Sequence, residues 1–205
     1  MMSFNPSKCK VIRMTGKRNP IKHTYQIYGQ DLREVTGGKY LGITLTHNLS
    51  WNCHVDDTMK KANNSLAFLR RNLASCPQEI KAQSYKTLVR PILEYASPVW
   101  DPYTETNITQ IEAVQRRAAR FVKGDYRPTS STSNMISQLG WSTLQYRREN
   151  SKMIMVYRIT HDLIDIPPVT FFHHLTLGGH GYGRRFLIPF CRTDVLKYSF
   201  LPSAI

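Results

Sequence analysis

Apolar residues recur at steps of three and four in the sequence after Ser50, and this spacing predicts amphipathic helices. Ser50 suits the N-cap of the first helix, because its hydroxyl can accept a hydrogen bond from a free backbone N–H. The inward stripe of that helix is Val55, Met59, Ala62, Leu66, Leu69 and Leu73. Pro77 fits the first turn of a second helix, which Pro91 should kink or restart because proline has no N–H. We expect its buried face to contain Ile80, Leu88 and Ile92.

Two further helices are predicted along the chain. One spans residues 104–124, and Gly124 is a typical helix stop. Its inward side should consist of Ile108, Ile111, Val114, Ala118 and Phe121. Ser142 and Gln145 have the spacing of a capping box, so the next helix should begin there and end near His161. Residues 127–134, which are rich in Ser and Thr, are expected to form a loop between the two helices.

The first 45 residues lack a helical period and contain three runs typical of β-strands, KCKVIRM, TYQIYG and KYLGITL. The Gly29–Gln30 step suits a hairpin turn, and Gly37–Gly38 suggests a break before the third strand. We therefore predict an α+β chain. A small antiparallel sheet occupies residues 1–50, a mainly helical bundle residues 51–165, and an irregular basic tail residues 166–205.

The charge composition indicates a polyanionic partner. The sequence has 28 Lys and Arg against 14 Asp and Glu, a formal net charge of +14. Nucleic acid is favoured over an anionic membrane surface, and no run approaches the roughly 18–20 apolar residues that cross a bilayer. The N-terminal residues do not resemble a signal peptide, so we expect an intracellular protein, in the nucleus or cytoplasm.

Catalytic and metal-binding patterns are not recognisable in the sequence. The four cysteines are scattered and expected to be free, and a zinc site from Cys53, His54 and the His173–His174 pair is not favoured. Asp56 and Asp57 are adjacent carboxylates, but on a helix they point about 100° apart. Histidines stand without an identifiable nucleophile, and no G-x-S-x-G elbow occurs. We therefore predict neither a catalytic residue nor a cofactor.

Basic residues are grouped on three of the predicted helices. They are Arg116, Arg117, Arg120 and Lys123, then Arg147, Arg148 and Lys152, and on the first helix Lys60, Lys61, Arg70 and Arg71. Each group alone would suit a solubilising outer face, but three such helices favour phosphate contacts with little sequence preference and steep salt dependence. Aromatic residues that could stack on bases, or equally belong to the core, are Tyr25, Tyr28, Tyr40, Tyr103, Tyr126 and Trp141.

Three sequence motifs follow one another along the chain: FNPSKCKVIRM, KYLGITLTHNLSWNCHV and LVRPILEYASPVWDPYTETNITQIEAVQRRAARFV. The first two resemble the late palm and primer grip of the reverse transcriptases of non-LTR (LINE-like) retrotransposons, and the third is similar to their helical thumb. LGWSTLQYRRENSKMIMVYRI resembles the segment that follows, and YSFLPSAI the opening of the family's C-terminal motif.

The resemblance implies roles for particular residues. Lys8 matches a palm lysine near the incoming nucleotide, and Tyr40, Leu41 and Gly42 match the primer grip, where a glycine within a strand would let the backbone approach the primer end. Trp51 and His54 would anchor the first thumb helix against that strand by packing.

The family's metal-binding carboxylates lie upstream of the residue that Phe4 matches, so Mg²⁺ is implied only for the intact parent enzyme. We accordingly expect binding of RNA or an RNA/DNA duplex, with no primer extension by this chain alone. Three alternatives stay open: a thumb that acts with a separate palm, a portion of an active reverse transcriptase, and a helical protein-binding module whose basic face meets an acidic partner.

Overall fold

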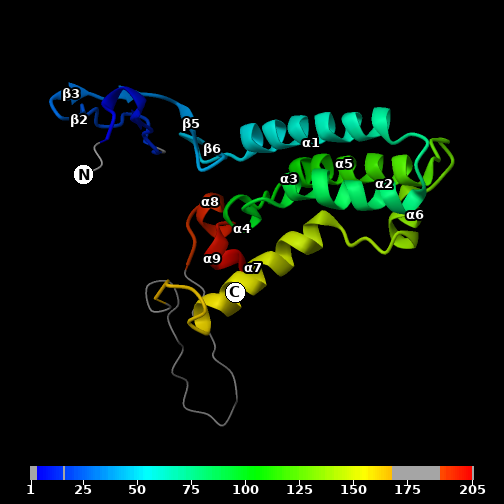
Figure 1. Cartoon of the computed structure of the whole chain (residues 1–205). Coiled ribbons are helices and arrows are strands. Elements are labelled where there is room, and N and C mark those ends of the chain that lie inside the picture. The colour runs from blue at the N-terminus through cyan, green and yellow to red at the C-terminus, as the bar shows by residue number, and fades with distance from the viewer. Residues whose placement is uncertain (1–3, 16, 168–189, 205) are drawn as a thin grey trace, which may run out of the picture. The chain divides into compact units, whose positions relative to one another are not determined.

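The structure is a computed structural model that describes residues 4–15, 17–167 and 190–204. The chain divides into two units, Met1–Asp57 and Thr58–Ile205. Helix α1 (Asn52–Asn72) starts in the first unit and continues into the second. The first unit contains short strands and the second is helical, so the predicted α+β class is confirmed (Figure 1).

The described residues of the first unit form three two-stranded sheets and a short 3-10 helix, η1 (Pro6–Lys8). Strands β2 (Gln26–Ile27) and β3 (Gln30–Asp31) form one antiparallel hairpin, and β5 (Gly37–Tyr40) and β6 (Ile43–Thr46) form another. The third pair, β1 (Lys10–Val11) with β4 (Arg33–Glu34), is parallel. The expectation of antiparallel pairing therefore holds for the two hairpins only.

Two hairpin turns differ from the sequence prediction. Tyr40 pairs with Ile43, so Leu41 and Gly42 form a two-residue turn with φ angles of 47° and 84°. Both angles are positive, as a type I′ turn requires, and glycine adopts such angles without strain. The prediction that KYLGITL is one strand with Gly42 inside it is wrong. Gly37 and Gly38 belong to strand β5 and are not a break before it. Tyr28 and Gly29 form the other turn, one residue earlier than expected.

The first turn of α1 is attached to the β5–β6 hairpin. His54 is buried, and its Nδ1 accepts a hydrogen bond from the backbone N–H of Thr44 at 3.2 Å. The Thr44 hydroxyl donates to Asp57 Oδ2 at 3.3 Å, and Lys39 pairs with the same carboxylate at 3.5 Å. The Trp51 ring meets His54 edge to face. The predicted packing role of His54 is thus confirmed.

The second unit is built around helix α5 (Glu105–Lys123), which contacts α2 (Gln78–Ser84), α6 (Thr132–Gln138) and α7 (Leu144–Thr160). A π-helical turn, η2 (Tyr85–Val89), joins α2 to α3 (Arg90–Glu94), and α4 (Ser97–Trp100) follows. In Figure 1, α7 runs beneath α5 towards the short C-terminal helices α8 (Asp194–Lys197) and α9 (Phe200–Ala204). Helices α8 and α9 form in a segment that was predicted to be irregular, while residues 168–189 lie outside the described residues.

The core of this unit confirms two predicted apolar stripes and corrects the third. Ala62, Leu66 and Leu69 of α1 are buried, and so are Ile111, Val114, Ala118 and Phe121 of α5. In the second helix, however, Ile80 and Leu88 are exposed, and the buried face is Tyr85, Val89 and Leu93. The Tyr85 hydroxyl donates to Gln115 Oε1 at 3.0 Å, so this tyrosine is satisfied inside the core.

Helix ends are close to their predicted positions. Gly124 ends α5 with a φ of 67°, as expected of a glycine stop. Helix α7 begins one residue later than predicted, because Thr143 and not Ser142 is its N-cap and accepts from the Tyr146 N–H. Helix α3 contains Pro91 in its first turn, which confirms the predicted restart.

Candidate nucleic-acid interface

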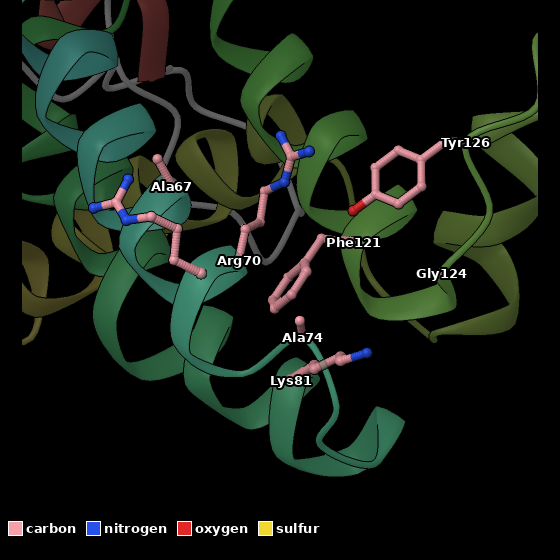
Figure 2. A pocket seen from close by; sticks show the side chains of 8 residues that line it. Ala67, Arg70, Ala74, Lys81, Phe121, Gly124 and Tyr126 are labelled. Atoms are coloured by element: carbon pink, nitrogen blue, oxygen red, sulfur yellow. The ribbon is translucent and has the colours of Figure 1, made fainter.

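A cavity of about 460 Å³ opens between the C-terminal half of α1, helix α2 and the end of α5 (Figure 2). Three cationic residues line it: Arg70 and Arg71 from the last turn of α1, and Lys81 from α2. The remaining lining residues are Ala67, Ala74, Phe121, Gly124 and Tyr126. Among the described residues no carboxylate lines the cavity, which is a positively charged site with an apolar and aromatic floor.

Two of the cations lie over aromatic rings. The Arg70 guanidinium carbon is 5.3 Å from the centre of the Tyr126 ring, and Lys81 Nζ is 5.5 Å from that of Phe121. Contacts at this distance hold a cation by the negative face of the ring while leaving its N–H groups available. The C-terminal ends of α1 and α5 add partial negative charge, which offsets part of the repulsion between these cations.

The basic residues of this site differ from Arg147 of α7 in whether they have a carboxylate partner. Among the described residues, no carboxylate lies within ion-pair distance of Arg70, Arg71 or Lys81. Arg147 of α7, by contrast, forms a two-point ion pair with Glu94, and this partner raises the pKa of Arg147 above its usual range. The charge of Arg147 is therefore compensated within the protein, whereas the three cations around the cavity have no such partner among the described residues.

The predicted residues Arg148 and Lys152 are not part of an exposed basic face. Arg148 is 1% exposed, and its Nε donates to Asp101 Oδ1 at 2.8 Å. Lys152 is also buried, and its Nζ lies 2.7 Å from Asp101 Oδ2 and 3.3 Å from the Ser203 hydroxyl. The prediction that both side chains are exposed is wrong. The helical period describes positions along one helix and contains no information on Asp101, which lies 47 residues before Arg148 and pairs with it.

The predicted basic residues of α5 divide into two kinds. Arg117 is exposed, and its Nη1 donates to Asn63 Oδ1 of α1 at 2.9 Å, which ties the two helices together. Lys123 is half-buried in the last turn of α5. Arg116 donates to the Thr109 carbonyl, and Arg120 donates to the carbonyls of Arg127 and Ser130. Arg116 and Arg120 are therefore partly engaged in holding the backbone.

The loop after α5 is held by a carboxylate clamp, defined here as Asp125 with its donors. Asp125 accepts from the Arg127 backbone N–H, from Arg127 Nε and Nη2, and from the Ser130 hydroxyl at 2.6 Å. The hydrogen bonds from Arg127 and Ser130 hold the pKa of Asp125 far below its ordinary value. Tyr126 follows Asp125 directly, so the clamp fixes the backbone that presents this ring to the cavity.

The residues matched to a palm and primer grip lie in the other unit. Lys8 is exposed at the end of η1, and Tyr40, Leu41 and Gly42 form the exposed tip of the β5–β6 hairpin. Their contacts with the primer end and the nucleotide stay predictions. Only the expected conformation of Leu41 and Gly42 changes, from strand to turn.

Sequence reasoning missed Lys81 and Phe121 as site residues and gave Tyr126 only as one of several possible stacking rings. Arg70 and Arg71 were recognised as basic positions but not as parts of a cavity. No local signal could have joined these residues, because they come from three helices and a loop. Trp141, another candidate for base stacking, is buried and stacks on Tyr85 with ring centres 4.5 Å apart.

Other features of the described residues bear on the choice of site. A second cavity of about 410 Å³ is mainly apolar and is lined by Pro98, Val99, Met155, Ile159, Ile166, Ser199 and Phe200. Within the described ranges, no three His, Cys, Asp or Glu side chains are placed to hold a metal ion. Among the same residues, no helix combines the length and apolar character needed to span a bilayer.

Two curated proteins of Drosophila melanogaster are similar to this chain over 126 residues. They are the probable RNA-directed DNA polymerase from transposon X-element, 25% identical, and that from transposon BS, 27% identical. The match covers 60% of this chain and 14% of each relative, so the chain spans a small part of their length. No family model and no solved structure matches. The similarity supports a distant relationship to RNA-directed DNA polymerases of transposons.

Proposed function

We propose that this chain derives from a non-LTR retrotransposon reverse transcriptase and that its helical unit binds nucleic acid with little sequence preference. The observation that carries the proposal is the cavity of α1, α2 and α5, where Arg70, Arg71 and Lys81 have no carboxylate partner among the described residues. The relatives are named as RNA-directed DNA polymerases, proteins that by name act on RNA and DNA.

The chemistry of the cavity suits phosphate groups. Guanidinium groups form paired, charge-assisted hydrogen bonds to phosphate oxygens, and lysine adds a mobile point charge. Contacts of this kind release counterions and read the backbone, not the base edges, so binding should be tolerant of sequence. We propose Arg117 and Lys123 of α5 as additional contacts.

The hairpin tip of the first unit is proposed as a separate contact. Tyr40 and Leu41 are both largely exposed, with 68% and 73% of their surface accessible. With Lys8, they would touch the primer end and nucleotide as the resemblance implies. The assignment of the two units to palm edge and thumb is part of the same proposal.

Salt-dependent RNA binding tests the main proposal. Anisotropy of a labelled RNA, measured at rising KCl, should give a slope of log K against log[salt] of about −2 to −3 from the three cavity cations, and a steeper slope where the additional cations also contact phosphates. Arg71→Gln should weaken binding and reduce the slope by about one, because Arg71 lines the cavity and forms no ion pair among the described residues that its loss would break. Arg158→Gln removes the same charge from an exposed site on α7 outside the cavity and should change neither quantity.

Two outcomes would contradict the proposal: no RNA binding at low salt, or equal effects of Arg71→Gln and Arg158→Gln. Absence of nucleic-acid binding would instead favour the alternative of a helical protein-binding module whose basic face meets an acidic partner.

A further inference from the structure

Tyr126 occupies an unusual position for a ring in a basic site. It is 52% exposed, lines the same cavity as three cations, and is covered only in part by Arg70 (Figure 2). A duplex presents phosphates and groove edges to a protein surface, and its bases are already stacked on one another. An exposed ring within reach of phosphate-binding cations is useful chiefly to a base that has no partner strand.

The backbone around Tyr126 is fixed before any ligand arrives. Gly124 ends α5 in the left-handed conformation, and the Asp125 clamp holds Arg127 and Ser130 on the other side of the tyrosine. Arg120 Nη1 donates to the Arg127 carbonyl at 2.9 Å and connects the loop back to α5. A ring on such a loop loses little conformational freedom on binding, which favours affinity.

The size of the cavity sets a limit on what it can enclose. Small-molecule sites generally run from about 300 to 1,000 Å³. At about 460 Å³, this cavity suits a group of nucleotide size and cannot admit a double helix. Its three cations can meet one or two phosphates while the ring meets one base.

We propose that this cavity selects an unpaired nucleotide of a single strand, with its base stacked on Tyr126 and its phosphates held by Arg70, Arg71 and Lys81. The inference rests on the proposed nucleic-acid binding and adds a preference for single-stranded over double-stranded segments at this site. The guanidinium of Arg70 has two roles here, because it binds phosphate and can also lie against the plane of a base.

Binding of a single-stranded uridine oligomer of about 12 nucleotides and of a blunt RNA duplex of equal length tests the inference. Tyr126→Leu should weaken binding of the single strand roughly ten-fold, since stacking is lost, and should leave duplex binding within about two-fold. Tyr146→Leu is the matched control, because Tyr146 is 54% exposed on α7 and does not line the cavity. It should bind both ligands as the unsubstituted protein does.

Tyr126→Phe provides a second readout that does not depend on loss of the ring. It should bind the single strand normally, because stacking uses the ring and not the hydroxyl. A single strand that carries 2-aminopurine should show fluorescence quenching with the unsubstituted protein and with Tyr126→Phe, but much less with Tyr126→Leu.

The outcomes distinguish this inference from the function on which it rests. If both RNAs bind but Tyr126→Leu affects them equally, or matches Tyr146→Leu, the single-strand preference is wrong while nucleic-acid binding stands. If neither RNA binds the unsubstituted protein, the proposed function itself fails. Circular dichroism of each variant should be unchanged; a Tyr126→Leu variant that loses helix, with Tyr126→Phe also defective in binding, would overturn the assignment of Tyr126 to stacking.

Discussion

Replacing Asp101, which directly follows the short helix α4, should strongly reduce the stability of the helical unit. Its Oδ1 accepts from Arg148 Nε at 2.8 Å and its Oδ2 from Lys152 Nζ at 2.7 Å. Both cations are more than nine-tenths buried, and Arg148 Nη1 and Nη2 have no hydrogen-bond partner in the described structure. Asp101→Asn keeps the shape of the side chain but leaves two buried positive charges without a compensating negative one.

The size of the effect follows from the burial of the pair. Removing one partner of a buried ion pair costs about 3–5 kcal/mol. The Asp101 side chain is 18% exposed, so solvent screens part of its charge and the lower end of that range is expected. A loss of about 3 kcal/mol corresponds to a fall in Tm of about 6–12 °C for a unit of this size. Lys152 keeps the Ser203 hydroxyl as a partner, which does not replace the lost charge.

Urea denaturation followed by far-ultraviolet circular dichroism measures this loss. Asp165→Asn is the matched control, because Asp165 is exposed and has no ion pair among the described residues; it should change stability by less than about 0.5 kcal/mol. Asp101→Asn combined with Arg148→Met should be more stable than Asp101→Asn alone, since one uncompensated charge is removed. A loss below about 1 kcal/mol for Asp101→Asn, or a double variant less stable than the single one, would refute the reasoning.

Three further predictions concern other polar contacts. Burial raises the pKa of Tyr85 far above its ordinary value, so the unfolded state alone should ionise above about pH 10 and stability should fall there. Tyr85→Phe should flatten that fall in denaturation curves measured at alkaline pH. The lowered pKa of Asp125 means that its clamp contributes stability above about pH 4 and loses it only as the pH falls further. Between pH 8 and 5 Asp125 should therefore stay ionised, and RNA binding should not weaken through its protonation. The prediction is wrong if binding weakens over this range in the unsubstituted protein but not in Asp125→Asn. His54→Phe removes the acceptor of the Thr44 N–H, and amide exchange of Thr44 should accelerate roughly ten-fold by NMR; an unchanged rate would show that the contact does not hold the hairpin.

Local patterns predicted the long helices well. The stripes of α1 and α5 and the glycine stop at Gly124 follow from a period of 3.6 and from the freedom of glycine at positive φ, which act within a few residues. The Leu41–Gly42 turn was missed, because leucine rarely adopts a positive φ and the segment therefore reads as a strand. The second helix has two apolar faces in sequence, and the structure buries the face of Tyr85, whose hydroxyl donates to Gln115 of α5.

The sequence by itself determined that this chain is α+β and strongly basic, and it supported a distant relationship to RNA-directed DNA polymerases of transposons. Tertiary structure alone decided which positive charges are paired with a carboxylate and which are not. Arg148 and Arg71 belong to similar basic runs, yet one is paired with Asp101 in the interior and the other lines an open cavity. Periodicity fixes the direction of a side chain on its own helix, whereas the availability of its charge depends on carboxylates that folding brings from distant segments.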